Sequence, residues 1–370
     1  MVHERKPTAS KKVRYALVGA GNIAQVAVLP GFRHADENSE LVALISRDAT
    51  KRARLCEEYA IELAGDYGEL ERLLEAGKVD AAYIATPNAL HAELVERAAR
   101  SKVHALCEKP LATSVAECEG MARACAENGV KLMVAYRLHF DEATLRAIEI
   151  VRSGKLGEPR IFDSVFTHVV RPGDIRTKEE LGGGALYDLG VYCINAARNL
   201  FGAEPVSVFA TSIEKDGVDD TTTAFLRFPK GELAQFTVSN SAVSVSSYRI
   251  TGTLGDLRLE PAYDYSVGLE HHLTLDEKTT THSFEKRDQF APEISYFSRC
   301  ILDDLEPEPS AEEGLCDMRV IEAARRSARS GTVVDLPPRE RPVRPSPEQA
   351  RRVPPVERPK TIRAPSPSVR

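Results

Sequence analysis

The chain has 370 residues, of which 42% are hydrophobic and 28% charged, and its formal net charge is −6. This length exceeds the size at which one core usually stops growing, so we expect two domains. The acidic balance disfavours a nucleic-acid binder. The first twelve residues are polar, and no apolar run approaches the ~18 residues of a membrane span, so we expect a cytoplasmic protein with no membrane partner. Seven cysteines without a Cys-x-x-Cys pair also favour a reducing compartment.

The first predicted strand, residues 15–18, runs into Gly19-Ala20-Gly21-Asn22-Ile23-Ala24, the Gly-x-Gly-x-x-Ala form of a dinucleotide-binding turn. Gly19 permits the tight turn, and Gly21 lets the backbone approach a pyrophosphate. The helix that begins with Asn22 and Ile23 offers free N–H groups and the positive end of its dipole to phosphates. The alternative is that these small residues serve only packing.

The next predicted strand, residues 41–45, ends at Ser46-Arg47, where a site for NAD usually places an acidic residue. A hydroxyl and a guanidinium, with Lys51 one turn further on, suit a ribose 2′-phosphate instead. The sequence therefore favours NADP, with NAD possible. The alternative is that Arg47 and Lys51 are solvated charges at the start of a helix.

Strand and helix patterns alternate up to Tyr136, which is typical of a doubly wound parallel sheet of the Rossmann kind. Ligands of such sheets bind at the carboxyl ends of the strands, where Thr86-Pro87-Asn88 and Glu108-Lys109-Pro110 fall. The predicted strands cover 79–85, 103–107 and 131–135, and the predicted helices cover 89–101 and 115–127.

After a predicted helix over 141–152, closely spaced strands indicate a second, α+β domain with a largely antiparallel open sheet. The last 34 residues carry a net charge of +6 and 10 of the 22 prolines, so we expect them to be disordered or extended. The predicted strands of the second domain cover 160–170, 206–213, 222–228 and 233–239, and further helices cover 293–302 and 311–329. The predicted organisation is a disordered tail over 1–12, a Rossmann domain over 13–136, a substrate-binding and oligomerisation domain over 137–336, and a disordered Pro/Arg-rich tail over 337–370.

A glycine-rich segment, Gly182-Gly183-Gly184, precedes a predicted helix in the second domain and lets backbone pass close to another group. Helical spacing places Asp188, Tyr192 and Asn195 on one face of this helix. Such a polar stripe is typical of a solvated face as well as of a catalytic one.

Together these motifs resemble the glucose-fructose oxidoreductase, inositol dehydrogenase and rhizopine-catabolism oxidoreductase family (Gfo/Idh/MocA) over residues 13–336. The resemblance rests on four segments: residues 19–24, Thr86-Pro87-Asn88 with His91, Glu108-Lys109-Pro110, and residues 182–184 with their helix. It implies a nicotinamide between the two domains, with Lys109, Asp188 and Tyr192 around the substrate carbon. Many members have histidine where this chain has Tyr192, and tyrosine there, like Arg137 after the last Rossmann strand, resembles the glucose-fructose oxidoreductase branch.

Oxidation of an alcohol requires removal of the O–H proton while hydride leaves the carbon. Tyrosine is a poor base near neutral pH unless a cation stabilises its phenolate. We therefore expect Tyr192 to exchange the proton, Lys109 to supply the cation and hold the substrate oxygen, and Asp188 to orient Lys109 or a second hydroxyl.

These expectations describe an NADP-dependent oxidoreductase acting on a sugar, a polyol or a related cyclic compound, in a homodimer or homotetramer. The alternatives are an enzyme that retains and recycles its NADP, and a non-catalytic sensor of NADP redox state. We expect no metal site, because His271-His272 lacks ligands at metal spacing, and Asp219-Asp220 is interpreted as a turn without chemistry. The predicted catalytic residues are Lys109, Asp188 and Tyr192, and the predicted cofactor-binding residues are Gly19, Gly21, Asn22, Ile23, Ser46, Arg47, Lys51, Thr86, Pro87, Asn88, His91, Glu108, Lys109 and Arg137.

Overall fold

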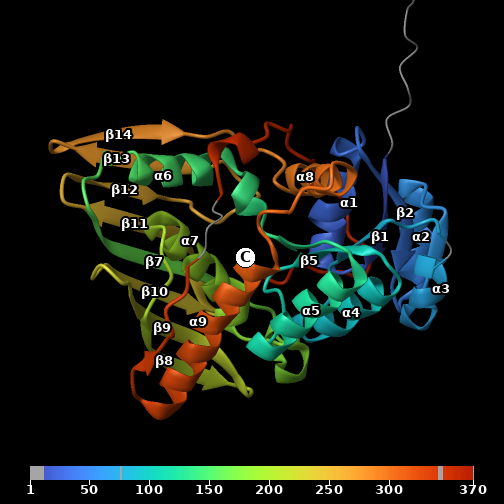
Figure 1. Cartoon of the computed structure of the whole chain (residues 1–370), viewed down its shortest axis with the longest axis horizontal. Helices are drawn as coiled ribbons and strands as arrows, with labels where there is room; N and C mark the ends of the chain where they lie inside the picture. Colours follow the sequence, from blue (N-terminus) through green and yellow to red (C-terminus); the bar gives the residue numbers. More distant parts are fainter. Residues whose placement is uncertain (1–11, 76, 341–344, 370) are drawn as a thin grey trace, which may run out of the picture.

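The computed structural model of the chain describes residues 12–75, 77–340 and 345–369, so most of the predicted N-terminal tail lies outside the described residues. Its architecture has two lobes, a smaller helix-flanked sheet and a larger sheet covered on one face (Figure 1). Within the described residues, no helix combines the length and the apolar character that crossing a membrane requires.

The first lobe is a six-stranded sheet in the order β3-β2-β1-β4-β5-β6, with all neighbouring strands parallel. Its central strands are buried on both faces, which explains their continuous apolar sequence. This is the predicted doubly wound sheet. Its strands are β1 (Val13–Val18), β2 (Ser39–Ile45), β3 (Leu63–Gly65), β4 (Ala81–Ile84), β5 (His104–Glu108) and β6 (Leu132–Ala135), and its helices are α1 (Leu29–His34), α2 (Ala49–Tyr59), α3 (Leu70–Glu75), α4 (His91–Arg100) and α5 (Val115–Asn128).

The second lobe is built on a nine-stranded sheet in the order β14-β13-β12-β11-β7-β10-β9-β8-β15. Its pairs are antiparallel except that β10 runs parallel to β7, so the predicted α+β class is confirmed for a mixed, largely antiparallel sheet. The strands are β7 (Pro159–Val169), β8 (Ser207–Lys215), β9 (Val218–Arg227), β10 (Leu233–Ser239), β11 (Ser241–Gly252), β12 (Gly255–Leu259), β13 (Glu270–Leu275), β14 (Lys278–Ser283) and β15 (Val334–Asp335). The hairpins of β11 to β14 were not among the predicted elements.

Three helices, α6 (Glu142–Arg152), α7 (Val191–Phe201) and α9 (Ala311–Ser330), lie along one face of this sheet (Figure 1). The opposite face carries half-exposed apolar side chains, including Ile161, Phe225 and Leu233. An exposed apolar sheet face is typical of a surface that meets another chain.

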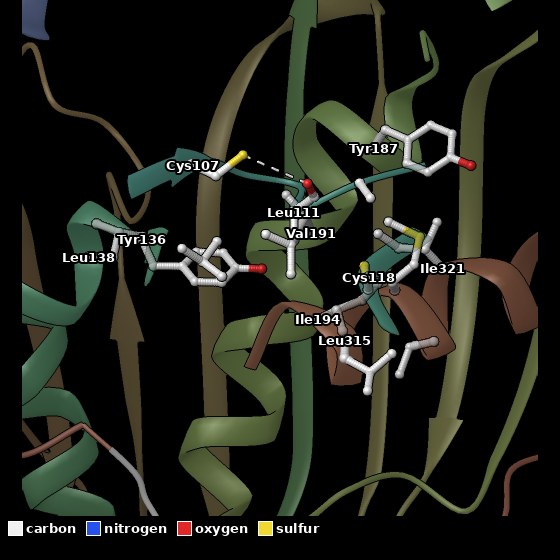
Figure 2. Packing of buried hydrophobic residues seen from close by; sticks show 14 of the residues in the cluster. Cys107, Leu111, Cys118, Tyr136, Leu138, Tyr187, Val191, Ile194, Leu315 and Ile321 are labelled. Carbon is white, nitrogen blue, oxygen red and sulfur yellow. Dashed lines mark hydrogen bonds between the residues drawn. The ribbon is translucent and has the colours of Figure 1, made fainter. Parts of the chain in front are cut away.

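A continuous hydrophobic cluster joins the two lobes. Figure 2 shows Cys107 and Leu111, at the end of β5, beside Val191 of α7, with Leu315 of α9 close by. The helix α8 (Phe290–Leu302) also crosses the predicted boundary at residue 136, because it packs on α1, β1 and β2 of the first lobe. The lobes therefore share their core where the loops after β5 meet α7.

The Pro/Arg-rich C-terminal segment is extended, but disorder does not describe its residues 345–369. Ile362 and Ala364 are each only 6% exposed, and Arg352 forms an ion pair with Glu142 at 2.7 Å. Composition alone did not reveal this packing, since single apolar residues between prolines provide the anchors and main-chain groups provide the hydrogen bonds.

Candidate active site

The predicted dinucleotide turn lies at the carboxyl end of β1. Gly19 has φ +107, and a Cβ added there would come 2.3 Å from the Ala85 carbonyl oxygen, so only glycine fits. A Cβ added at Gly21 would meet no atom within 4 Å, so this side of the turn is open. Thr86 follows β4 directly opposite, and its Oγ1 is buried without a hydrogen-bond partner in the described part of the chain.

The residues expected to hold a 2′-phosphate lie at the end of β2. Ser46 is buried and Arg47 exposed, with the Arg47 guanidinium 5.9 Å from the centre of the Tyr67 ring. Asp48 caps the helix α2 by accepting a hydrogen bond from the Lys51 N–H at 3.1 Å. The cap places the side chains of the first turn of α2 next to the end of β2.

The loop after β4 connects the two lobes. The Asn88 side-chain amide donates a hydrogen bond to the Gly182 carbonyl oxygen at 2.8 Å. His91 is fully buried, and its two ring nitrogens face the carbonyl oxygens of Pro110 at 3.0 Å and Thr86 at 3.1 Å. His91 thus braces the two predicted cofactor loops against each other.

Lys109, Asp188 and Tyr192 come together at the interface of the lobes. The Lys109 ammonium donates to the Asp188 carbonyl oxygen at 2.9 Å and lies 3.7 Å from the Asp188 carboxylate. The same ammonium is 4.4 Å from the centre of the Tyr192 ring. Because Lys109 lies over the ring face, it interacts with the π system of Tyr192. Both Lys109 and Asp188 keep 13% of their side chains exposed.

Two further residues hold the Asp188 carboxylate. Arg176 Nε donates to Asp188 Oδ2 at 2.6 Å, and His168 Nε2 lies 3.4 Å from the same oxygen. Burial acts to raise the pKa of Asp188, but the charges of Arg176 and Lys109 and the nearby ring of His168 together hold that pKa well below its usual range. Asp188 is therefore ionised at neutral pH. Sequence reasoning missed Arg176 and His168, which no motif marks.

Arg137 and Glu108 are also predicted to bind cofactor, and both side chains contact other residues of the protein. Arg137 Nη2 donates to the Tyr263 carbonyl oxygen at 2.5 Å, and its guanidinium lies 5.0 Å from the centre of the Tyr192 ring. Glu108 is buried and accepts a hydrogen bond from Tyr83 at 3.0 Å. Burial raises the pKa of Glu108, although the Lys109 charge opposes this shift. Arg137 thus borders Tyr192, and Glu108 faces the interior.

The helix carrying Asp188 and Tyr192 contains a π-helical turn over Leu186–Gly190, followed by α7. Tyr192 and Asn195 both follow this turn in regular helix and line the same small cavity, but Asn195 makes its hydrogen bonds away from Asp188. Asn195 is buried and binds His139, Glu313 and Asp317 in an interior polar network. His139 belongs to the same buried network, since it also contacts Glu308.

The glycines before this helix serve close packing within the protein. A Cβ added at Gly183 would come 2.6 Å from the Arg176 carbonyl oxygen, and one at Gly184 would come 2.3 Å from Asp219 Oδ1. Asp219 accepts a hydrogen bond from the Leu186 N–H at 2.7 Å. The interpretation of Asp219 as a turn residue was wrong. Asp219 lies in β9 and accepts the hydrogen bond of a backbone N–H group at the start of the helical segment that carries Asp188.

These features fit a bound dinucleotide. The open space at Gly21, the unpartnered hydroxyl of Thr86, and the cations at the end of β2 follow one edge of the sheet. The Lys109 ammonium and Tyr192 lie at the other end of this edge. The arrangement corresponds to an extended ligand whose reactive end reaches the interface of the lobes.

Comparison with known proteins identifies the family. Residues 13–136 match the model of an oxidoreductase family with an NAD-binding Rossmann fold, and residues 144–258 match the Gfo/Idh/MocA C-terminal domain. The chain belongs to the Gfo/Idh/MocA oxidoreductase family. The expected resemblance and the expected class of NAD(P)-dependent oxidoreductase are thereby confirmed.

Several members of the Gfo/Idh/MocA family are similar over most of the chain. D-xylose 1-dehydrogenase [NADP(+)] of Haloarcula marismortui is 33% identical, with 90% of this chain and 96% of that protein covered. The structure of aldose-aldose oxidoreductase from Caulobacter crescentus, complexed with glycerol, is 36% identical with a TM-score of 0.83, and 88% of this chain and 100% of that chain are covered. A 3-ketoreductase from Actinomadura kijaniata, in complex with NADP and TDP-benzene, is 29% identical with a TM-score of 0.80, and 86% and 98% of the two chains are covered.

Proposed function

We propose that this protein is an NADP-dependent oxidoreductase that transfers hydride between the nicotinamide and a hydroxyl- or carbonyl-bearing carbon of a sugar or related polyol. The observation that carries the proposal is the convergence of Lys109, Asp188 and Tyr192 beside an open dinucleotide turn. The relatives named for D-xylose and NADP support the substrate class and the cofactor.

The cofactor would lie along the carboxyl edge of the first sheet. Backbone N–H groups of Asn22 and Ile23 would receive the pyrophosphate, because the first N–H groups of a helix have no partner within it. Ser46, Arg47 and Lys51 would hold the 2′-phosphate. The chemistry that NADP supplies when bound is acceptance of hydride from the substrate carbon, or its donation in the reverse direction.

Side chains of the protein transfer the proton and stabilise the developing charge. In the oxidative direction the Lys109 ammonium donates a hydrogen bond to the substrate oxygen and stabilises the negative charge that develops there. Ionised Asp188, whose carboxylate also contacts Arg176 and His168, keeps the Lys109 ammonium in place. The hydroxyl proton passes to the oxygen of Tyr192, and the cationic groups of Lys109 and Arg137 lie 4.4 Å and 5.0 Å from the centre of its ring. Reduction runs through the same groups in reverse.

The substrate would lie on the side of Tyr192 that faces Lys109. The cavity behind Tyr192, lined by Tyr136, His139 and Tyr263, has a volume of about 20 Å³, enough for a water molecule and far too small for a sugar. Lys109 and Asp188 are also partly exposed. The exposed apolar face of the second sheet would meet a second copy of the chain, giving the expected homodimer or homotetramer.

The similarity to an aldose-aldose oxidoreductase favours one further arrangement, in which two sugars react in turn with a retained cofactor. In that case one sugar is oxidised, the other is reduced by the same nicotinamide, and no net NADPH is released. Both arrangements use the same residues and differ in whether cofactor leaves between steps.

The test is absorbance at 340 nm when purified protein is mixed with NADP or NAD and a panel of aldoses and cyclic polyols, with product analysis of sugar pairs alongside. An NADP-dependent rise, or paired oxidation and reduction without one, supports the proposal. The variant Tyr192→Phe should lower turnover by about 10²- to 10³-fold, whereas Tyr59→Phe, on the distant helix α2, should not. Near-normal turnover by Tyr192→Phe would rule out its assignment, and binding of NADP without turnover of any substrate would favour the redox sensor.

A further inference from the structure

The last part of the chain, residues 361–369, hereafter the C-terminal strap, lies against the dinucleotide turn. The Ile362 N–H donates to Gln25 Oε1 at 2.7 Å, and the Gln25 amide donates back to the Ile362 carbonyl oxygen at 3.1 Å. The Asn22 amide donates to the Ala364 carbonyl oxygen at 3.0 Å. Ile362 also packs in the hydrophobic cluster of the first lobe. The strap is thus anchored at the helix that begins with the predicted pyrophosphate site.

The other end of the strap is held by the second lobe. The Val369 N–H donates to the Val169 carbonyl oxygen at 2.9 Å, and the Arg171 N–H donates to the Pro367 carbonyl oxygen at 2.8 Å. Val170 and Ser368 form an antiparallel bridge between these bonds. In Figure 1 the C-terminal end accordingly lies between the two lobes. Nine residues therefore span from the cofactor turn to the end of β7, the strand that carries His168.

The strap also brings a cation to the end of β2. Arg363 Nη1 lies 3.6 Å from Asp48 Oδ1, and 65% of the Arg363 side chain is exposed. Asp48 directly follows Ser46-Arg47, so Arg363 stands beside the residues proposed to bind the 2′-phosphate. Arginine suits this role because its planar guanidinium forms paired hydrogen bonds with phosphate oxygens.

The strap leaves the cofactor position free. With the strap in place, a Cβ at Gly21 still meets no atom within 4 Å. Among the described residues, the hydrogen bonds between strap and turn use the side chains of Asn22 and Gln25, and the helix N–H groups remain available for a phosphate. A segment that occupied the ligand's place would fill this space and pair with these N–H groups.

We propose that the C-terminal strap is part of the cofactor site, closing over bound NADP with Arg363 on the 2′-phosphate, so that cofactor release requires the strap to detach. This inference rests on the proposed function, because it assumes that NADP binds at the turn. It adds a cofactor-binding residue from outside the Rossmann domain and explains why a Pro/Arg-rich tail is held by both lobes. Slow release is also the property that a retained, recycled cofactor requires.

The test is the rate at which NADPH leaves the protein. Protein loaded with NADPH is mixed with excess NADP in a stopped-flow instrument, and the loss of bound-nicotinamide fluorescence gives the release rate constant. Four proteins are compared: the full chain, a chain ending at Lys360, Arg363→Ala, and the control Arg352→Ala, which removes an exposed arginine of the same tail that pairs with Glu142. Release rates come only from molecules that hold NADPH, so partial unfolding of the shortened chain does not imitate the effect.

The chain ending at Lys360 should release NADPH at least about tenfold faster than the full chain, a change of about 1.4 kcal/mol. Arg363→Ala should speed release of NADPH about threefold and leave release of NADH unchanged, and Arg352→Ala should match the full chain. Equal release rates for the shortened and full chains would overturn the proposal, as would tighter NADPH binding by the shortened chain, which would make the strap a competitor. If neither chain binds NADPH, the proposed function itself fails, and it fails separately from the strap.

Discussion

Two glycine-containing segments, one in each lobe, lead into the site, and they differ in what lies beside them. At Gly21 the space next to the backbone is empty, whereas at Gly183 and Gly184 it is filled by the Arg176 carbonyl and the Asp219 carboxylate. Both segments begin helices that lead into the site. The first therefore leaves room for a ligand, and the second fixes the position of Asp188 by contact with the protein itself.

This difference separates binding from catalysis. Changes at the first segment should alter cofactor affinity with little effect on stability, and changes at the second should alter stability and turnover. The four predictions below test whether the two segments have these different roles.

The largest effect is expected at Lys109, which links the two segments. Lys109→Ala removes the cation beside the substrate oxygen and Tyr192, so kcat at saturating NADP should fall by about 10³-fold. Steady-state kinetics on a responsive sugar would measure this, with Lys102→Ala, in an exposed turn, as a control. A loss of less than tenfold would remove Lys109 from the chemistry.

Next comes a matched pair of glycine substitutions. Gly184 has φ +125 and would place its Cβ 2.3 Å from Asp219, so Gly184→Ala should lower the free energy of unfolding by about 3 kcal/mol. Gly21→Ala should leave that free energy within about 0.5 kcal/mol of the wild type and weaken NADPH binding about tenfold, because the methyl group would enter the ligand's space. Urea unfolding and fluorescence titration measure the two quantities. The assigned roles would be wrong if both variants lowered the free energy of unfolding and neither changed NADPH affinity.

The third prediction concerns pH. Burial raises the pKa of Asp219 to about 6 from 3.8, against the hydrogen bond from Leu186 and the charge of Arg325. Between these values the folded protein holds a proton that the unfolded chain has released, so the contribution of Asp219 to stability is present below pH 4 and lost as pH rises through 6. Relative to Asp219→Asn, the wild type should lose roughly 2–3 kcal/mol between those pH values.

Urea unfolding at several pH values from 4 to 7 measures this difference. A gap between Asp219→Asn and the wild type that does not change with pH would show that Asp219 titrates in the folded protein as it does in the unfolded chain.

The smallest effect is expected at the end of β2. The double variant Arg47→Ala, Lys51→Ala removes two cations from the proposed 2′-phosphate position, so NADP affinity should fall about tenfold and NAD affinity should stay the same. Arg54→Ala, an exposed arginine of the same helix, is the matched control. Equal losses of affinity for NADP and NAD would show that the two cations attract either cofactor without binding the 2′-phosphate. Unchanged affinity for both cofactors would show that the two side chains are only solvated.

Local motifs predicted the turn after β1 and the loop after β5. Gly19, Gly21 and Lys109 are recognisable because a turn or a strand end fixes their place through neighbouring residues in the sequence. The doubly wound parallel sheet of the first lobe was predicted from the same alternation of strands and helices.

The catalytic side was predicted less completely. His168, Arg176 and Asp219 reach Asp188 or its helix from separate elements, and no local pattern encodes such long-range contacts. Helical spacing also grouped Asn195 with the catalytic residues, but its side chain binds Glu313 and Asp317 of α9, which are distant in the sequence. The packing of the C-terminal tail was missed because composition describes the average behaviour of a segment and not the few anchors that hold it.

Hydride transfer itself can be followed with an aldose that carries deuterium on its reacting carbon. After a single turnover, the cofactor is extracted from the protein and its mass is measured. The account predicts one deuterium on the reduced nicotinamide of the wild type and almost none with Lys109→Ala or Tyr192→Phe. A reduced nicotinamide without deuterium would contradict the claim that the substrate carbon transfers hydride to NADP. Full labelling with both variants would contradict the claim that Lys109 and Tyr192 promote this transfer.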